Sequence, residues 1–311
     1  MATIEPFHVS AFSVALGLQD GLTRGAMRGP RFSAPFYGIR EGATVVEPLS
    51  PADKRLAEYA PQLWELRLLA ERYAPRLRPG QFFSHETALG LLHSPTPDEW
   101  KPLLHVSCYR PAAAPSARGV SGHRLQIRTP AWTLVGGLPV ENPARAWVQA
   151  SDDWPPDDLI AAADHLVLTK RRLATIDELR AEAAAFRGRA LDAVLDDVRD
   201  GAESFRETAL RLACQRGGLP APTLNTEVFT STGRFIARID QLYPRYRVAA
   251  EYDGRQHAMD AAQFARDADR TEAIRAAGWD HIRILRHHLE PDPAPAVAKI
   301  AAALTRGGWR P

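Results

Sequence analysis

Two acids and a histidine lie within seven residues in the stretch EYDGRQH, at positions 251–257. The stretch directly follows YRVAA, which reads as a buried β-strand. Glu, Asp and Gly are all depleted in strands. A strand that ends in carboxylates therefore indicates a purpose other than core packing.

A further acid, Asp240, lies in the preceding strand-like segment RFIARIDQLY. If Pro244-Arg245 forms the turn, Asp240 faces Ala249 across the hairpin, about 7–8 Å from Glu251 on the diagonal. Side chains alternate along strands, so one face is predicted to carry Asp240, Ala249, Glu251 and Asp253, and the other Ile239, Val248, Ala250 and Tyr252. The prediction depends on the turn, because a slip of one residue exchanges the faces.

Three carboxylates on one face repel one another unless a cation, an arginine or a proton neutralises them. Magnesium, with Mn²⁺ as a substitute, is the simplest cation, and it holds oxygen ligands at about 2.1 Å. We therefore predict a metal site formed by Asp240, Glu251 and Asp253. The ion would activate water beside a phosphate, and His257 would shuttle a proton or position that phosphate.

Other polar residues leave alternatives open. Glu207 closes an S-x-x-E capping box that begins at Ser204, and it either caps a helix or reaches the metal face from that helix. Asp267 and Arg270 share a helical face, which favours an ion pair, whereas Arg266, Arg270 and Arg275 would alternatively approach phosphate.

The remaining histidines carry weaker signals. His85 and Glu86 fit the capped start of a helix, and His105 fits a strand with apolar neighbours. A second group shows no metal-ligand spacing and is interpreted as surface residues: His281, His287 and His288.

The elements that must position the acids follow from periodicity and turn signals. A helix over 204–218 is followed by three strands, a helix from Asp260 to Ala277, the strand 281–285 and a closing helix over 294–304. This αβββαβα order predicts a small α/β sandwich.

The region ahead of this sandwich is expected to begin with a small head. The pattern over 7–40 predicts a short helix, a turn, a second basic helix and a strand, as in a helix-turn-helix or winged-helix head. The segment 53–72 predicts a helix interrupted at Pro61, and the middle region is mixed α+β.

The C-terminal motifs together resemble a known family. They are G-x-x-S-x-x-E at 201–207, R-I-D at 238–240, E-Y-D-G-x-x-H at 251–257, and D-x-x-R followed by G-W within 267–279. Over about 198–290 the chain resembles the endonuclease-like domain related to very-short-patch repair endonucleases, within the PD-(D/E)XK superfamily. The resemblance implies a restriction-endonuclease-like fold and Mg²⁺-dependent cleavage, with Asp240 as the leading acid and Glu251 as the second ligand.

One position departs from the superfamily pattern. Asp253 stands where the motif carries a lysine, and an aspartate supplies no positive charge to the transition state. The very-short-patch group also lacks this lysine and uses a nearby histidine, so Asp253 with His257 is a candidate equivalent. The departure equally fits an inactive domain that only binds DNA.

The front half resembles AbiEi-type antitoxin-like, transcriptional-regulator-like proteins. The resemblance is carried by PFYGIR (35–40), FFSHETALGLL, LLHVSCYRP, GVSGHRLQ, GLPVENPARAW and AAADHLVL. It implies a DNA-binding head followed by a regulatory or association domain. We accordingly expect a head at 1–80, an α+β region with a helical connector at 81–198, and the endonuclease-like domain at 199–311.

Composition narrows the class of protein without deciding it. The chain has 311 residues, a net charge of +2, and 35 arginines against 4 lysines, a bias that suits phosphate but also reflects a GC-rich genome. An acidic N-terminus and the lack of a long apolar run predict a cytoplasmic protein without a membrane span. Cys108 and Cys214 are expected to be reduced and buried.

Two functions follow as hypotheses. The first is a Mg²⁺-dependent endonuclease that acts on DNA, most simply double-stranded. The second is a DNA-binding antitoxin-like regulator whose nuclease-like domain has lost activity. Substrate specificity and a homodimeric state are left open.

Overall fold

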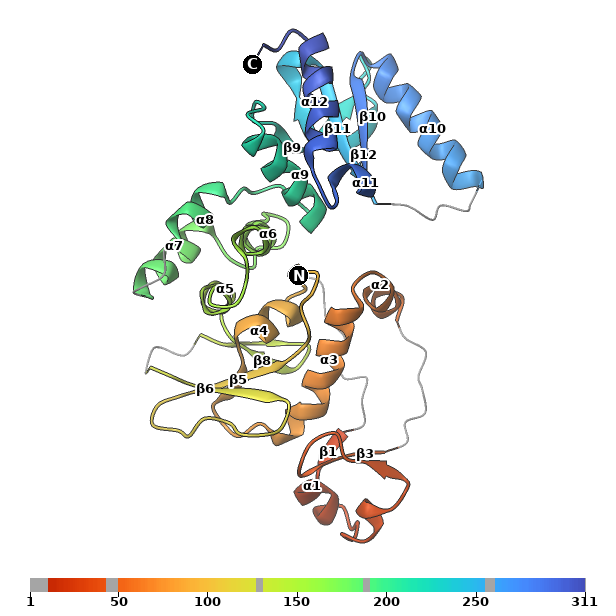
Figure 1. The fold of residues 1–311 in the computed structure, drawn as a ribbon. Coiled ribbons are helices and arrows are strands. Elements are labelled where there is room, and N and C mark those ends of the chain that lie inside the picture. The colour runs from red at the N-terminus through yellow and green to blue at the C-terminus, as the bar shows by residue number, and fades with distance from the viewer. Residues whose placement is uncertain (1–10, 43–49, 127–130, 187–190, 255–260, 311) are drawn as a thin grey trace. The chain divides into compact units, whose positions relative to one another are not determined.

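The computed structural model describes residues 11–42, 50–126, 131–186, 191–254 and 261–310, the last without the side chains of 261–265. The chain divides into two compact units (Figure 1). The N-terminal unit comprises Met1–Ala162 and Leu173–Leu191, and the C-terminal unit comprises Ala163–Arg172 and Asp192–Pro311. The predicted head at 1–80 and most of the region 81–198 therefore belong to one unit, whereas 163–172 and 192–198 belong to the same unit as 199–311.

The N-terminal segment forms a small antiparallel sheet rather than a helix-turn-helix. The strand order is β1-β3-β2, and one helix and one 3-10 turn accompany the sheet. The elements are β1 Ala11–Ser13, α1 Val14–Gln19, the 3-10 turn Ala26–Arg28, β2 Phe32–Ser33 and β3 Ile39–Gly42. The expected second basic helix is thus wrong, because Gly25, Gly29 and Pro30 surround its centre and disfavour helix there.

The rest of the N-terminal unit is a mixed five-stranded sheet of order β6-β5-β4-β8-β7 with helices around it. Its strands are β4 Gln81–Phe83, β5 Leu104–Tyr109, β6 Val120–Leu125, β7 Thr133–Val135 and β8 Leu138–Val140. Its helices are α2 Pro51–Tyr59, α3 Pro61–Tyr73, α4 His85–Leu91, α5 Pro143–Ala150, α7 Ile176–Ala185 and the first part of α6 Pro156–Val167, whose residues from Ala163 onward belong to the C-terminal unit. The interruption at Pro61 is confirmed, because α2 ends at Tyr59 and α3 begins at Pro61. A capping box at Thr175 opens α7.

The C-terminal unit has the αβββαβα order that the sequence predicts. A short helix, α8 Asp192–Asp197, precedes it, and a second short helix, α11 Arg286–Leu289, follows the last strand. The main elements are α9 Phe205–Arg216, β9 Thr223–Phe229, β10 Phe235–Tyr243, β11 Val248–Asp253, α10 Ala261–Ala276, β12 Asp280–Leu285 and α12 Ala294–Arg306. The strands form a sheet of order β12-β11-β10-β9, in which only β11 and β12 are parallel.

Two apolar clusters fix the faces of this sheet. Val248 and Ala250 pack with α9 and α12, and Tyr252 adjoins them, as predicted. Ile239 was expected with this group but packs with Ala249 and with Ile274 of α10. Glu251 alternates with Ala250 and therefore lies on the α10 side.

The β10–β11 hairpin has a longer turn than the predicted two residues. Pro244–Tyr246 form a 3-10 turn, and Arg247 closes it with a left-handed backbone (φ 55°). Leu242, not Asp240, therefore lies opposite Ala249. The register differs from the prediction by two residues. Ala249 and Glu251 keep their predicted face of β11, whereas Ile239 lies on the other face from the one predicted.

Two simpler expectations can be assessed within the described residues. Cys108 and Cys214 are free and buried, as expected. None of the helices that the structure describes is both long and apolar enough to cross a membrane.

A buried ion pair joins the segment 163–172 to helix α9 of the C-terminal unit. Asp164, 1% exposed, accepts hydrogen bonds from Nη2 of Arg211 (2.7 Å), from Oγ1 of Thr208 (2.8 Å) and from the backbone N–H of Arg199 (2.7 Å). Arg211 itself is only 4% exposed. This cluster holds the end of α6 and the residues after it against α9.

Asp164→Leu is expected to destabilise the C-terminal unit by about 3–5 kcal/mol, because it leaves the buried Arg211 guanidinium without a counter-charge. Urea unfolding of the full chain measures the change. The double variant Asp164→Leu/Arg211→Met removes both charges and is expected to recover most of the loss. A double variant no more stable than the single one would show that the pair is not the source of the effect.

Candidate functional site

Asp240 lies where the pairing of β10 with β11 stops. The ladder between these strands comprises Tyr243–Val248, Leu242–Ala249 and Gln241–Ala250. One position further, the backbone N–H of Tyr252 donates to Oδ2 of Asp240 at 2.8 Å. A side-chain carboxylate thus takes the place of a backbone acceptor, which holds Asp240 beside the end of β11.

The electrostatic setting of Asp240 disfavours its charged form. Burial and the neighbouring carboxylates of Glu207 and Glu251 raise its pKa to about 7, although the Tyr252 N–H and Arg270 oppose the shift. Near neutral pH the protonated form is therefore favoured far more than it is for an ordinary aspartate. A cation bound at Asp240 would relieve this cost by stabilising the carboxylate.

Glu251 is neutralised by two partners from later elements. Its Oε1 accepts from Nη2 of Arg270 (2.5 Å), and its Oε2 accepts from Nη1 of Arg270 (3.1 Å) and lies 2.5 Å from Nε2 of His281. Burial would raise the pKa of Glu251, but the hydrogen bonds from His281 and Arg270 lower it below its usual value. Glu251 is therefore held as a carboxylate.

His281 was interpreted as a surface residue, and this is wrong. It is 5% exposed and pairs with Ala249 in the parallel ladder between β11 and β12, next to Glu251 on the same face. Arg270 reaches across from α10 to Glu251 and also to the backbone carbonyl of Arg238. Neither contact has a local sequence signal, because both depend on how α10 returns the chain to the sheet.

Glu207 caps α9, as one of the two alternatives held, and its carboxylate also lies near Asp240. Its backbone N–H donates to Oγ of Ser204 (3.2 Å), and its carboxylate accepts from the Ser204 hydroxyl (2.9 Å), so it completes the start of α9. The same carboxylate accepts from Nδ2 of Asn225 (2.6 Å) and interacts electrostatically with Asp240. Burial raises the pKa of Glu207, against the bonds from Asn225 and Ser204.

Asp253, another predicted site residue, has a different partner from this group. Asp253 forms an ion pair with Arg283 of β12. The three acids predicted to bind metal do not place one oxygen each within 4.8 Å of one another. Within the described ranges, the group of possible metal ligands that meets this spacing consists of histidines. His257 lies outside the described residues.

Cations reach the acids from a distant segment that sequence reasoning did not include. Nζ of Lys170 lies 2.5 Å from Oε1 of Glu203, which is also paired with Arg238 of β10. Lys170 and Arg171 both interact electrostatically with Glu207. The basic run TKRR at 169–172 was the available signal, but its position beside α9 depends on the buried Asp164 pair.

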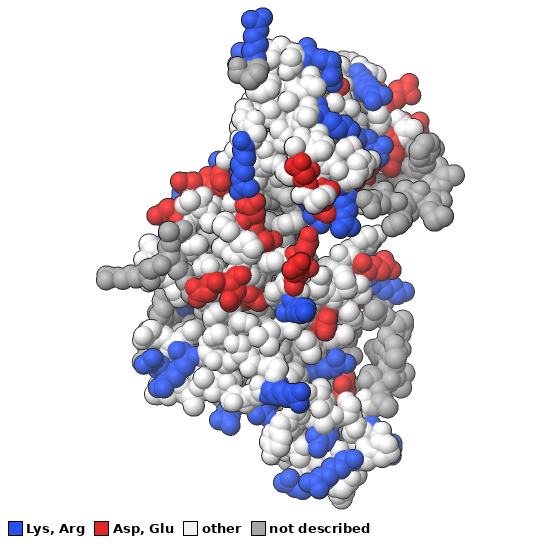
Figure 2. All heavy atoms as spheres, viewed as in Figure 1, with Lys and Arg blue, Asp and Glu red and all other residues white. Residues whose placement is uncertain are grey.

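The donor set suits Mg²⁺ in chemical type. Asp240 and Glu251 supply the hard oxygen ligands that Mg²⁺ prefers, and the buried Asp240 carboxylate lacks a formal ion-pair partner among the contacts above. Asp253 is engaged with Arg283 and is a poor third ligand in this arrangement. The residues that fit the ion are therefore Asp240 and Glu251, with Glu207 adjacent. Figure 2 shows the acidic and basic side chains at the surface of one face of the molecule.

Comparison with known proteins finds partial similarity only. No family model matches the chain, and no solved structure matches it. Uncharacterized protein MT2308 and uncharacterized protein Rv2248, from the CDC 1551 / Oshkosh and H37Rv strains of Mycobacterium tuberculosis, are each 31% identical to it over 132 residues. The match covers 42% of this chain and 48% of each relative, so the chain spans about half the length of the curated relatives it matches.

The raised pKa of Asp240 predicts how stability changes with pH. Its folded-state pKa (about 7) lies above the unfolded value near 4, so protonation of Asp240 favours the folded state. This contribution to the free energy of unfolding is complete below about pH 4 and is lost as pH rises to 7. Asp240→Asn imitates the protonated form. It is expected to exceed wild type in stability by roughly 1–4 kcal/mol at pH 8 and to match it at pH 4.

Urea unfolding from pH 4 to 8 in EDTA measures this difference, because chelation removes any cation that would lower the pKa. The matched control is Asp280→Asn, at an exposed pair with Arg306, and its effect is expected to stay within about 1 kcal/mol. A stability difference for Asp240→Asn that does not change with pH would contradict the assignment.

Arg270 is expected to stabilise the fold through Glu251. Arg270→Leu leaves the buried carboxylate with His281 alone and is expected to lower stability at pH 7 by about 1–3 kcal/mol. Thermal unfolding compares it with Arg306→Leu, which breaks an exposed pair and is expected to change stability by less than about 1 kcal/mol. Equal effects of the two variants would show that the Glu251 contact is not special.

Proposed function

We propose that the C-terminal unit is a Mg²⁺-dependent endonuclease that hydrolyses phosphodiester bonds in double-stranded DNA. The observation that carries the proposal is the buried carboxyl of Asp240, held at the end of the β10–β11 ladder beside Glu251 and Glu207. A perturbed carboxyl with acidic neighbours favours a functional role over a structural one. The αβββαβα order and the R-I-D and E-Y-D motifs support the same function.

In this proposal Asp240 and Glu251 hold the metal ion. When bound, Mg²⁺ activates water and stabilises negative charge on the phosphate. His281 keeps its bond to Glu251 and fixes the orientation of that carboxylate, as outer residues do around metal ligands. Arg270, which is 40% exposed, turns from Glu251 toward the phosphate. Asp253, bound to Arg283, is not assigned a role as ligand.

We propose that Lys170 supplies the positive charge that the lysine of the superfamily motif supplies and that position 253 lacks. It is exposed, it pairs with Glu203, and it lies within electrostatic reach of Glu207 and Arg238. Position 253 holds an aspartate, so the positive charge in this unit must come from another segment. Lys170, Arg171 and Arg238 supply it, and we propose that they contact the phosphates that flank the cleaved bond.

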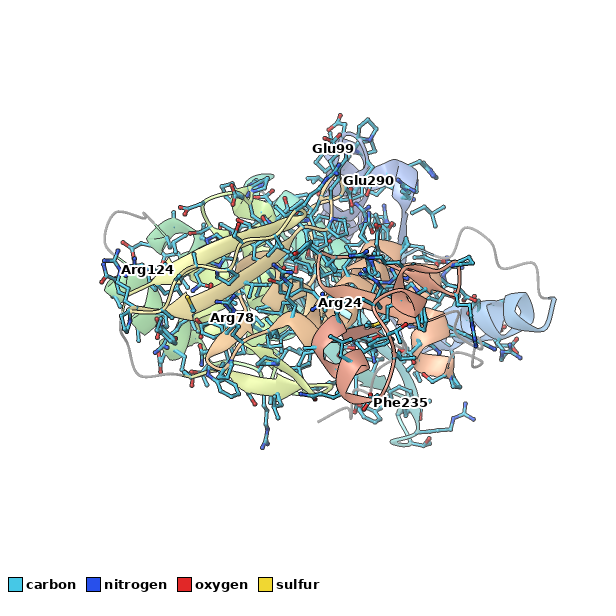
Figure 3. All side chains as sticks on the ribbon, turned by 90° about the horizontal axis from the view of Figure 1, so that it is seen from below. Arg24, Arg78, Glu99, Arg124, Phe235 and Glu290 are labelled. Carbon is cyan, nitrogen blue, oxygen red and sulfur yellow. The ribbon has the colours of Figure 1, made fainter. Side chains whose placement is uncertain are left out.

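The N-terminal sheet provides a surface for the DNA backbone. Arg24, Arg28 and Arg31 are all exposed on the loop between α1 and β2. Arg24 lies on this segment in Figure 3. Exposed arginines favour binding to phosphate that weakens as salt increases. This role does not require the helix-turn-helix that the sequence predicted.

A second candidate function is DNA binding by a regulator whose nuclease-like unit is inactive. The specific observation in its favour is that the protein neutralises its own acids. Arg270 and His281 engage both oxygens of Glu251, and Arg283 engages Asp253. These acids have partners even when no metal ion is bound, as a domain without catalytic activity would need.

Cleavage of supercoiled plasmid tests the choice. Wild-type protein is incubated with Mg²⁺ or Mn²⁺, with EDTA as the metal-free control. We expect nicking or linearisation that falls at least 100-fold in Asp240→Asn and in Glu251→Gln, because each removes a charged metal ligand. Asp280→Asn, an exposed acid of the same sheet, serves as the matched control and is expected to cleave as wild type does.

Binding of the same duplex, measured in parallel, separates the two candidates. Salt-sensitive binding without cleavage, in protein shown to be folded, would overturn the nuclease and support the regulator. Cleavage that persists in both acid variants would show that Asp240 and Glu251 do not form the active site.

A further inference from the structure

Three histidines far apart in the sequence meet in the N-terminal unit. His85 begins α4, His105 lies in β5 and His123 lies in β6. These elements adjoin one another in Figure 1. Each histidine offers one ring nitrogen, and the three nitrogens lie within 4.8 Å of one another. This is the group of metal-ligating side chains that meets such a spacing in the part of the chain that the structure describes.

The parallel pairing of β5 with β6 produces the closest contact. His105 lies opposite Ser121, and Ser107 lies opposite His123, so the two histidines are two positions apart on one face. Nε2 of His123 approaches Nδ1 of His105 to 3.1 Å. Two nitrogens bound to one tetrahedral Zn²⁺ at about 2.0–2.1 Å are separated by about 3.3 Å, close to this spacing.

The third histidine is held in an unusual backbone conformation. His85 has φ 52°, in the left-handed region that residues with a side chain rarely adopt. Its Nδ1 lies 2.9 Å from the Ser84 hydroxyl, which in turn lies 2.5 Å from the hydroxyl of Ser107. A capped start was expected for this helix, but Ser84 at the cap position forms no side-chain capping bond, and its hydroxyl contacts the His85 ring instead. Strain of this kind is concentrated at functional sites.

Acidic neighbours complete the surroundings of the cluster. Oε2 of Glu86 lies 4.0 Å from Nε2 of His105 and accepts a hydrogen bond from the indole N–H of Trp100 (2.6 Å). A carboxylate on the far nitrogen is the usual device that orients a metal-binding imidazole. Asp153 interacts electrostatically with both His105 and His123. The negative charge around the three rings favours a cation.

From this geometry we propose that His85, His105 and His123 bind one transition-metal ion, with Zn²⁺ as the best match. Three neutral imidazoles suit Zn²⁺ and its neighbours, whereas Mg²⁺ prefers oxygen ligands. The site is therefore chemically distinct from the carboxylate site and does not depend on the proposed nuclease function. Three protein ligands leave a fourth position for water, next to the Ser121 hydroxyl, which lies 3.2 Å from Nε2 of His123.

Metal binding requires one local movement. The rings of His85 and His123 are stacked, with centroids 3.8 Å apart and planes inclined by 19°. Because a metal ion lies in the plane of each imidazole that binds it, one ring must turn out of the stack. His85 is partly exposed at the start of a helix, so its side chain makes the turn while His105, 7% exposed, stays in place.

Titration of the full chain with Zn²⁺ tests the proposal. The protein is prepared without a polyhistidine tag and treated with EDTA, and binding is followed by calorimetry. Wild type is expected to bind one equivalent, and His123→Gln and His85→Gln are expected to bind at least 100-fold more weakly. Exposed His287→Gln, in the other unit, is the matched control and is expected to bind as wild type does.

Two further readouts keep the test independent of folding and of nuclease activity. Co²⁺ in place of Zn²⁺ is expected to give visible absorption bands of a nitrogen-bound ion in wild type and not in His123→Gln. Zn²⁺ is expected to raise the melting temperature of wild type and of His287→Gln only, and Mg²⁺ is not expected to reproduce the rise through this site. The absence of stoichiometric binding at micromolar Zn²⁺, or equal binding by His123→Gln shown to be folded, would overturn the proposal.

Discussion

The free energy required to remove a carboxylate from water is the constraint that organises the C-terminal unit. Asp164 and Glu251 meet it with arginine partners, Arg211 and Arg270, each contributed by a different helix. Asp240 receives a backbone N–H and lies among acidic neighbours, so burial leaves it dependent on a proton. The same unit thus contains acids that stabilise the fold and one acid whose charge the fold does not balance.

The fully paired acids determine where other charges lie. The Asp164 pair anchors the segment after α6 to α9, which brings Lys170 and Arg171 toward Glu207. The Glu251 pairs connect α10 and β12 to the middle of the sheet. Positive charge is therefore delivered to the candidate site by structure rather than by a local motif, which is consistent with an aspartate at position 253.

The N-terminal unit follows a similar logic with different chemistry. Its site consists of imidazoles rather than carboxylates, and β5 and β6 bring ring nitrogens of His105 and His123 to 3.1 Å from each other. The left-handed backbone at His85 adds the third. Because nitrogen and oxygen ligands select different cations, the two sites that we propose, one in each unit, would take a transition metal and magnesium respectively.

Local pattern determined the order of elements in the C-terminal unit and the placement of Ala249 and Glu251 on the face of β11 opposite Val248 and Ala250, because side chains alternate within one strand whatever its register. Local pattern failed in two kinds of place. The turn geometry at Pro244–Arg247 changed the register of the β10–β11 hairpin. The glycine-rich segment around Gly25 formed a 3-10 turn in place of the helix expected in the head. The partners of each site were decided by tertiary structure alone, because His281, Lys170 and His123 reach their neighbours through strand pairing and helix packing between segments remote in sequence.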